Sequence, residues 1–206
     1  MSKEICIFGA GGFAKEVFFL AKECMYTVNA FIDIHSGSLY GIKIETDDYF
    51  DPKLHLAVVA VGNPMLREKI VNQIIKRHGD DVFVSLISPS ANRLGGDTIQ
   101  IGKGSIICPN CVLTCDISLG DFTQLNLATT IGHDVKADDF FTTAPGAHIN
   151  GNMHIGKRVY FGSNASTKEG VNICDDVTVG AAACVTRHIS EAGTYVGTPA
   201  QKLMKK

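Results

Sequence analysis

The sequence predicts a small Rossmann-like α/β domain followed by a left-handed parallel β-helix, and three observations support this fold class. Bulky apolar residues recur every six positions from Ile101 to Val185 without an insertion. The residue after each of them is often small, as at Gly102, Gly120 and Gly132. The residues before the repeat alternate between strand-like and helix-like segments. A six-residue period sustained over this length is typical of a hexapeptide β-helix and fits neither an α-helix nor an ordinary strand.

The segment before the repeat has the alternation of strands and helices that indicates a small parallel sheet. In chain order we predict a strand at 5–8, a helix at 13–24, strands at 30–33 and 56–61, a helix at 65–77 and a strand at 82–87. Pro64 suits the first turn of the second helix. We therefore divide the chain into a Rossmann-like domain, residues 1–87, and a β-helix domain with a C-terminal loop, residues 88–206.

A glycine-rich turn connects the first strand to the first helix. Residues 9–14, Gly-Ala-Gly-Gly-Phe-Ala, satisfy the pattern G-x-G-x-x-G/A, and Asp33 follows at a spacing suited to a ribose contact. Glycines let the backbone approach a phosphate, and the helix offers free N–H groups at its positive end. Because the domain is about half of a dinucleotide fold, we expect a nucleotide-linked substrate rather than NAD. A tight turn without a ligand is the alternative interpretation.

Each hexad is expected to supply one strand and one turn. The bulky first residue points inward, and the small second residue is expected to permit the turn. A second inward set lies four places on, from Ser105 to Ala183, and contains no charged residue. Three hexads close one triangular coil, so residues eighteen apart stack at about 4.8 Å. Hexapeptide coils wind left-handed, against the usual crossover preference.

His133 is the strongest candidate for a catalytic base. It lies in the run 131–135, Ile-Gly-His-Asp-Val, where the Asp134 carboxylate can orient the imidazole and raise its basicity. A histidine with a pKa near 6.5 is a natural general base at neutral pH. Gly151 follows eighteen residues later. Stacking therefore predicts a groove beside the imidazole and an unobstructed backbone N–H for a developing oxyanion. A turn histidine that bonds only within its coil is the alternative.

No metal site is expected. Cys108, Cys111 and Cys115 form a C-x2-C-x3-C run, but no fourth ligand is spaced nearby, which favours reduced thiols that fill coil positions. His148 and His154 are six residues apart, whereas solenoids resembling γ-class carbonic anhydrases bind zinc through two histidines five apart and a distant third.

Charge and hydropathy exclude two further classes. Lys and Arg total 19 against 21 Asp and Glu, a net charge of -2, so no basic excess favours nucleic acid. No apolar run approaches the roughly 20 residues that cross a bilayer. The N-terminus enters a strand-like run without a signal-peptide layout. We expect a cytoplasmic protein without a membrane partner.

The order of motifs resembles one family over nearly the full chain. The motifs are Gly-Ala-Gly-Gly at 9–12, Phe-Ile-Asp at 31–33, Ala-Val-Gly-Asn-Pro-x-x-Arg at 60–67, the hexads, Ile-Gly-His-Asp at 131–134 and Val-Gly-Thr-Pro-Ala at 196–200. This order is similar to the sialic-acid O-acetyltransferase-like family, which includes bacterial N-acetyltransferases of nucleotide-linked 4-amino-4,6-dideoxy sugars. The resemblance implies a homotrimer that binds acetyl-CoA between neighbouring solenoids and serves surface glycan or lipopolysaccharide biosynthesis.

The resemblance also implies roles for individual residues. His133 matches the catalytic base and Asp134 the acid beside it. The positions that match the sugar-nucleotide site are Gly11, Gly12, Phe13, Asp33, Gly62, Asn63 and, near the reacting amine, Asn126. The positions that match acetyl-CoA contacts are Thr142, Gly151, Pro199 and Ala200.

The chain departs from the family pattern at three of these positions. Phe13-Ala14 replaces a common His-Gly, and Asp33-Ile34 replaces a pair of acids. Thr142 stands where relatives often carry a histidine.

We therefore expect acetyl transfer by direct attack of the substrate amine on acetyl-CoA, with His133 as the general base. A sugar O-acetyltransferase of the sialic-acid type and a non-catalytic sugar-nucleotide-binding solenoid are the alternatives. The sequence leaves open whether the base is uridine, thymidine or guanosine, and which sugar stereochemistry is accepted.

Overall fold

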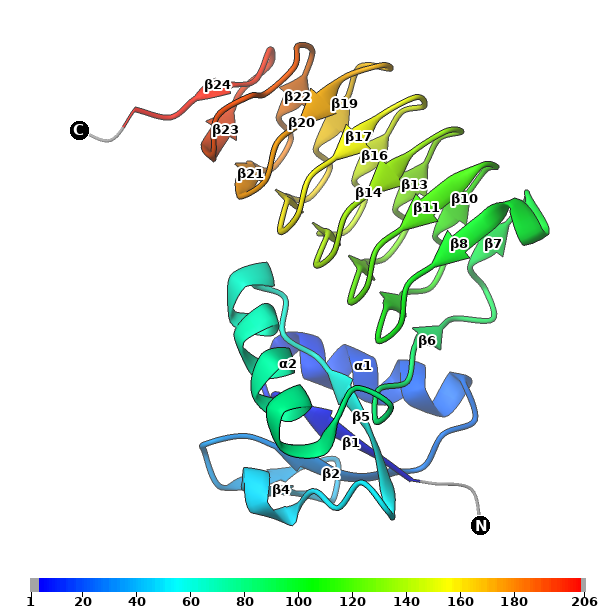
Figure 1. Cartoon of the computed structure of the whole chain (residues 1–206), viewed down its shortest axis with the longest axis vertical. Coiled ribbons are helices and arrows are strands. Elements are labelled where there is room, and N and C mark those ends of the chain that lie inside the picture. Colours follow the sequence, from blue (N-terminus) through cyan, green and yellow to red (C-terminus); the bar gives the residue numbers. More distant parts are fainter. Residues whose placement is uncertain (1–3, 205–206) are drawn as a thin grey trace.

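The computed structural model describes residues 4–204 and shows an α/β domain against one side of a three-sided solenoid (Figure 1). The N-terminal segments form a five-stranded sheet in the order β3-β4-β2-β1-β5. Its elements are β1 (Glu4–Phe8), α1 (Gly12–Glu23), β2 (Val28–Ile32), β3 (Gly37–Leu39), β4 (Ile42–Glu45), the 3-10 turn η1 (Asp47–Tyr49), β5 (His55–Val59) and α2 (Pro64–His78). All pairs are parallel except β3 with β4.

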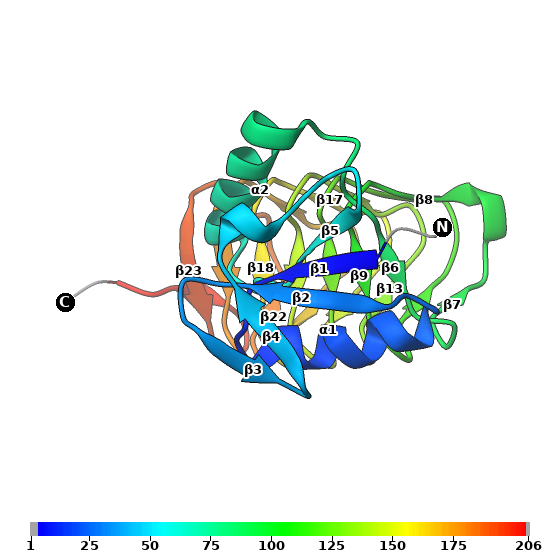
Figure 2. The same cartoon turned by 90° about the horizontal axis from the view of Figure 1, so that it is seen from below.

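The two helices cover opposite faces of this sheet (Figure 2). Ile5 and Ile7 of β1 pack in the cluster that contains the apolar face of α1, whereas Cys6 and Phe8 pack with Val71 of α2. This alternation is the period of two expected for a strand that is buried on both sides. The prediction of a small parallel sheet with alternating helices is confirmed.

Two local predictions differ from the structure. The β3–β4 hairpin is not among the predicted elements, and its two-residue turn is formed by Tyr40 and Gly41, both with positive φ. The strand predicted at 82–87 is mostly irregular, and only Leu86–Ile87 forms a strand, β6. That strand pairs with β9 (Ile106–Ile107), so it belongs to the solenoid rather than to the α/β sheet.

Hexads build three sheets, which are parallel except where β24 pairs antiparallel with β23, and we name them in the order in which the chain meets them. The first sheet contains β6 (Leu86–Ile87), β9 (Ile106–Ile107), β12 (Gln124–Leu125), β15 (Thr142–Thr143), β18 (Tyr160–Phe161), β21 (Val177–Val179), β23 (Gly193–Val196) and β24 (Gln201–Lys202). The second contains β7 (Asn92–Arg93), β10 (Val112–Leu113), β13 (Thr130–Ile131), β16 (His148–Ile149), β19 (Ser166–Thr167) and β22 (Cys184–Val185). The third contains β8 (Ile99–Ile101), β11 (Ile117–Leu119), β14 (Lys136–Ala137), β17 (His154–Ile155) and β20 (Asn172–Ile173).

Strand register confirms the stacking of residues eighteen apart. Leu113 pairs with Ile131, and Ile131 pairs with Ile149. The two predicted inward sets form the solenoid core, in which Phe141 and Phe161 have no exposed surface. We call the turn from the first to the second sheet the first corner, the next the second corner, and the return to the first sheet the third corner.

The small residues after the bulky positions have a different role from the one predicted. The positive φ that turns each corner belongs to the fourth hexad position, for example in Ala128, Asp134 and Phe140. Glycines at the second position instead allow close stacking, because a Cβ on Gly132 would lie 2.5 Å from the backbone N of Gly151 in the next coil.

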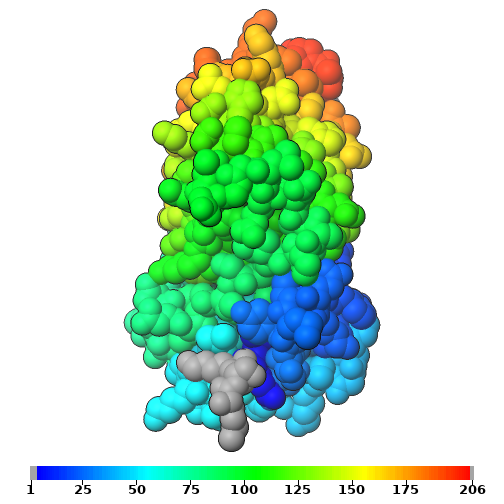
Figure 3. Space-filling model, turned by 90° about the vertical axis from the view of Figure 1, so that its right-hand side faces the viewer, coloured from blue at the N-terminus to red at the C-terminus, as the bar shows by residue number. Residues whose placement is uncertain are grey.

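The α/β domain packs along the first sheet, from Ile106 near the N-terminal end of the solenoid to Arg158 at the third corner. Ile106 of that sheet joins the α1 cluster, and Phe122 and Phe140 at the third corner join the α2 cluster. In Figure 3 the domain, in blue and cyan, forms the lower part of the molecule, and the solenoid lies above it. Among the described residues, no helix is long and apolar enough to span a membrane.

Candidate active site

His133 lies at the second corner, between β13 and β14, with Asp134 beside it. The Nδ1 atom of His133 is 2.8 Å from Oδ2 of Asp134, and both side chains are more than half exposed. Asp134 adopts a φ of 56°, a left-handed conformation that aspartate tolerates better than most residues. The hydrogen bond and the charge of Asp134 raise the pKa of His133 above its usual value. The neutral imidazole can therefore keep its proton on Nδ1 and leave Nε2 free to accept another.

Gly151 lies directly against the imidazole from the next coil. A Cβ built on Gly151 would be 2.6 Å from Nε2 and 2.7 Å from Cε1 of His133. The absence of a side chain is therefore necessary for the observed position of the ring. Stacking predicted a bare backbone above His133, and the structure shows that the ring itself occupies part of that space.

The second corner continues from Gly151 to Glu169 and Arg187, each eighteen residues further along the chain. A hollow of about 450 Å³ is lined there by Lys168, Glu169, Gly170, Val171, Thr186, Arg187 and His188. Because coils rise by about 4.8 Å, Arg187 lies about 14 Å along the solenoid from His133. One corner thus carries a candidate base and, further along, two cations.

The remaining predicted acetyl-CoA residues lie in different environments. Thr142 is buried beneath the α/β domain, and its hydroxyl is 2.5 Å from Nη2 of Arg67. This location does not support a cofactor contact and gives Thr142 a place in the domain interface. Pro199 and Ala200 lie in the C-terminal loop, where the Ala200 N–H donates to the Cys184 carbonyl at the end of the second sheet.

Asn126 lies at the first corner of the coil that continues to His133. Its Oδ1 accepts the N–H of Leu127 at 2.7 Å, and its side chain is half-buried. Asn126 and His133 therefore flank the two edges of the second sheet and occupy successive corners of one coil.

The glycine-rich turn lies at the carboxyl end of β1. Nothing lies within 4 Å of a Cβ position on Gly11 or Gly12, so internal packing does not explain these glycines. Asp33, after β2, accepts the N–H of Ala10 at 2.9 Å and holds the turn. The carboxylate keeps further lone pairs for a ligand hydroxyl. Phe13 is half-buried against the α1 cluster.

The chain order changes direction between β1 and β5, because β2 lies on one side of β1 and β5 on the other. Ligands of open α/β sheets bind at such a switch point, at the carboxyl ends of the strands. The loops there contain Gly11, Gly12, Gly62 and Asn63. Oδ1 of Asn63 accepts the N–H of Leu66 at 2.9 Å, so Asn63 also caps α2.

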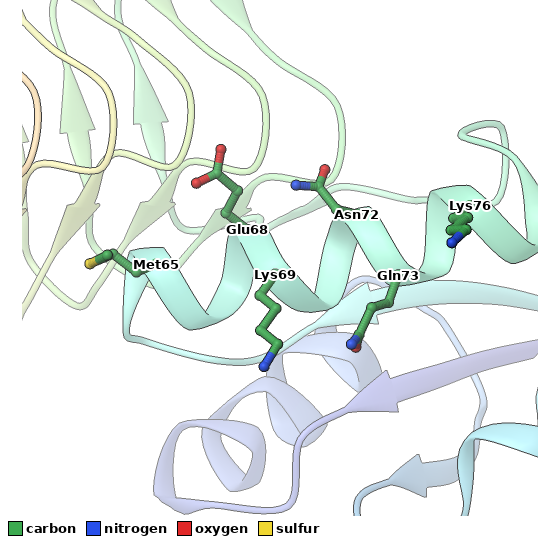
Figure 4. A pocket seen from close by; sticks show the side chains of 6 residues that line it. All are labelled: Met65, Glu68, Lys69, Asn72, Gln73 and Lys76. Carbon is green, nitrogen blue, oxygen red and sulfur yellow. The ribbon is translucent and has the colours of Figure 1, made fainter.

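A pocket of about 500 Å³ connects this edge to the solenoid. It is lined by Gly62, Asn63, Pro64, Met65, Arg158, Tyr160, Asp176 and Thr178. The last four come from the third corner and the first sheet, so the pocket lies between the two domains. A second hollow, over α2, is lined by Met65, Glu68, Lys69, Asn72, Gln73 and Lys76 (Figure 4). The side chains of Lys69 and Glu68 point to opposite sides of the helix there, so they do not converge on one point.

The cysteine run places Cys108 and Cys111 in buried positions, and Cys111 points inward as predicted. Burial raises the pKa of the Cys111 thiol to about 11, which disfavours the thiolate. All seven cysteines are free, and no group of three metal-ligating side chains occurs within residues 4–204.

Comparison with known proteins places these features in one family. The PglD N-terminal domain matches residues 4–74, and the hexapeptide repeat of succinyl-transferase matches residues 153–187. The GDP-perosamine N-acetyltransferase of Escherichia coli O157:H7 is 28% identical over 176 residues, 80% of this chain and 78% of that protein. WeeI from Acinetobacter baumannii AYE has a TM-score of 0.90 and 31% identity over 98% of this chain and 100% of its own. The chain belongs to the family of hexapeptide-repeat sugar N-acetyltransferases.

A crystal structure from this N-acetyltransferase family shows both ligands of a relative. It is a histidine-to-asparagine mutant of the perosamine N-acetyltransferase from Caulobacter crescentus in complex with CoA and GDP-perosamine. Its TM-score is 0.91 at 26% identity, over 100% of this chain and 99% of that chain.

Three residues of this chain that lie at or near the candidate site are not predicted from the sequence: Lys168, Arg187 and Arg67. Lys168 and Arg187 were overlooked because a charge at a corner usually faces solvent. In the sequence Arg67 is only one position of a longer motif, and its burial depends on contacts with coils 55 to 75 residues away. The eighteen-residue step, extended from His133, predicts the place of Arg187.

Proposed function

We propose that this chain transfers the acetyl group of acetyl-CoA to the 4-amino group of a nucleotide-linked amino-dideoxy sugar. The observation that carries the proposal is the His133–Asp134 pair, whose imidazole lies over the bare backbone of Gly151. The relatives add the chemistry, because one is named for GDP-perosamine acetylation and another was crystallised with CoA and GDP-perosamine.

In the proposed reaction the amine nitrogen attacks the thioester carbon. A C–N bond forms, the C–S bond breaks, and the CoA thiolate leaves. His133 accepts the amine proton at Nε2, while its Nδ1–H donates to Asp134, which stabilises the imidazolium. Placing both substrates in one groove contributes through effective molarity. No covalent acetyl-enzyme is needed.

We place acetyl-CoA along the second corner. The thioester lies at His133, the pantetheine arm passes Gly151, and the phosphates reach the hollow with Lys168 and Arg187. A span of about 14 Å is one that an extended pantetheine arm covers. The C-terminal loop with Pro199 and Ala200 lies beyond, at the end we assign to the adenine.

We further propose that three copies assemble around their second sheets. The positions of this sheet in register with Val112 carry no Asp, Glu, Lys or Arg: Asn92, Val112, Thr130, His148, Ser166 and Cys184. The third sheet presents Lys136 and His154 in equivalent positions. Because Asn126 and His133 flank the second sheet, a cyclic trimer brings His133 of one copy next to Asn126 of the partner subunit. Isolated copies would then lack part of the site.

The nucleotide is assigned to the carboxyl edge of the α/β sheet, with the diphosphate at the Gly11-Gly12 turn. The pocket of about 500 Å³ between the domains adjoins the same edge at Gly62 and Asn63. We place the enzyme in the cytoplasm, in surface glycan biosynthesis, because sugar nucleotides and acetyl-CoA are cytoplasmic metabolites and its seven free cysteines fit a reducing compartment.

One experiment tests this proposal directly. Acetyl-CoA is mixed with UDP-, dTDP- and GDP-linked 4-amino-4,6-dideoxy sugars, and free thiol and product mass are followed. We expect one donor–acceptor pair to give a product with one acetyl group that withstands mild alkali, as an amide does. Thiol release that does not depend on any amino sugar, or an alkali-labile product, contradicts the N-acetyltransferase assignment.

A further inference from the structure

Arg67 is the largest fully buried side chain of the described residues, and the proposed mechanism gives it no role. Each of its five N–H groups has an acceptor. Nε donates to the Phe122 carbonyl at 3.1 Å. Nη1 donates to the Val61 carbonyl at 2.8 Å and to Oε1 of Gln124 at 2.9 Å. Nη2 donates to the Phe140 carbonyl at 2.9 Å and to the hydroxyl of Thr142 at 2.5 Å.

These acceptors belong to three separate segments of the chain. Val61 lies in the loop between β5 and α2, which the proposed function assigns to the sugar nucleotide. Phe122 and Gln124 belong to one coil, and Phe140 and Thr142 lie eighteen residues further, in the next. Gln124 reinforces this arrangement, because its Nε2 donates to the Val59 carbonyl at the end of β5.

The chain between the two coil contacts includes His133. It leaves β12 at Leu125, passes the first and second corners, and returns at β15 with Thr142. The guanidinium therefore holds both ends of the coil that carries the proposed base. It also holds the loop at the carboxyl end of β5.

The chemistry of the site requires arginine. Five donors in a fixed planar fork match five acceptors, whereas lysine offers three donors at one atom. Burial lowers the pKa of Arg67 to about 9, so the side chain remains charged at neutral pH. None of its acceptors is a carboxylate, so the charge is stabilised by carbonyl, amide and hydroxyl oxygens alone.

Arg67 is not needed merely to attach the domains. Glu68, the next residue on α2, points toward the solenoid (Figure 4) and forms ion pairs with Lys157 and Arg158 at 2.6 Å and 3.2 Å. Phe122 also packs edge-on against Phe83 with ring centroids 4.9 Å apart. These contacts hold the same interface at the third corner.

We propose that Arg67 is a positioning residue that fixes the Val61–Gly62 loop, and with it the bound sugar nucleotide, relative to the coil that carries both Asn126 and His133, the residues that meet between neighbouring copies in the proposed trimer. This inference rests on the proposed function. In this proposal Arg67 determines the distance between the acceptor amine and the base, although its side chain contacts neither of them.

The test compares Arg67→Lys with Arg77→Lys, a matched change on the same helix at an exposed ion pair with Asp47. We expect Arg67→Lys to lower kcat/KM for the nucleotide-linked amino sugar by at least about 10-fold, because misplacement by about 1 Å is costly. The KM for acetyl-CoA and the slow turnover of the same amino sugar without its nucleotide should stay within about 2-fold of wild type. An equal loss with both acceptors, or no loss with either, overturns the proposal.

We call the contacts of Arg67 with the Val61–Gly62 loop and the two coils the Arg67 clamp. Hydrogen exchange tests this clamp without any substrate. The amides of residues 61–63 should exchange faster in Arg67→Lys, while those of β13 and β16 remain as slow as in wild type. Gln124→Met, which removes one acceptor and is close in shape, serves if Arg67→Lys does not fold, and a smaller change in the same direction is expected. Unchanged exchange in the folded variant overturns the clamp. If the wild-type protein acetylates no nucleotide-linked sugar, the proposed function is wrong. The exchange experiment then still shows whether Arg67 holds the loop in place.

Discussion

The imidazole of His133 and the backbone of Gly151 occupy adjacent coils with no room between them for a methyl group. We predict that Gly151→Ala displaces the ring and lowers kcat by about 100-fold, the usual effect of misplacing a reacting group by about 1 Å. Steady-state kinetics at saturating acetyl-CoA measure the effect.

A double-mutant cycle gives the control for this prediction. If the methyl group acts only by displacing the imidazole, Gly151→Ala should cost almost nothing in a His133→Ala background. His133→Ala alone should lower kcat by about 100- to 10,000-fold, as loss of a general base does. Equal losses from Gly151→Ala in both backgrounds would show that the glycine serves another purpose.

Asp134 sets the pH dependence of the proposed reaction. Its hydrogen bond and charge raise the pKa of His133, and only the neutral imidazole accepts a proton. Activity in the wild type therefore falls as the pH drops through that raised pKa. In Asp134→Asn the pKa returns toward its usual value, so we expect the acid limb of the kcat/KM profile to move to lower pH.

A histidine NMR titration measures the same shift without turnover. Asn is favoured at the positive φ of position 134, which protects the fold. Asp116→Asn, one coil away at the same corner position, is the matched control and should move the pKa of His133 less, because Asp116 raises it only through charge. An acid limb that moves upward in Asp134→Asn would contradict the assignment.

Lys168 and Arg187 are predicted to bind the phosphates of acetyl-CoA. Replacing both by alanine should raise the KM for acetyl-CoA by about 10-fold or more and leave kcat nearly unchanged, because the contacts are the same in ground and transition states. Acetyl-pantetheine, which lacks the diphosphate and ribose phosphate, should be used equally well by the variant and the wild type. If the variant loses activity with both donors, the cations do not serve the phosphates.

Much of the solenoid could be predicted from the sequence, because a single period of six determines inward positions and, through steps of eighteen, neighbours in the next coil. The step of eighteen alone therefore places Gly151 beside His133. The contacts of Arg67 could not be predicted in this way, since its acceptors at Phe122, Gln124, Phe140 and Thr142 belong to the other domain, 55 to 75 residues away. The run 82–87 divides between the two domains, because Phe83 forms a parallel bridge with Ala57 of β5 whereas Leu86–Ile87 pairs with β9, and an apolar run does not reveal its pairing partner.

If the proposed trimer is correct, a new positive charge on the second sheet should disrupt assembly, whereas the same charge on the third sheet should not. Ser166 on the second sheet and Asn172 on the third point outward at equivalent hexad positions. Ser166→Arg places three cations around the proposed three-fold axis, where burial of unpaired charge is strongly unfavourable. Asn172→Arg places the same cation on a sheet that already presents Lys136. We expect sedimentation equilibrium to give a trimer for the wild type and Asn172→Arg, and smaller species with little activity for Ser166→Arg. A trimeric, active Ser166→Arg protein would place the subunit interface elsewhere and would separate Asn126 of the partner subunit from His133.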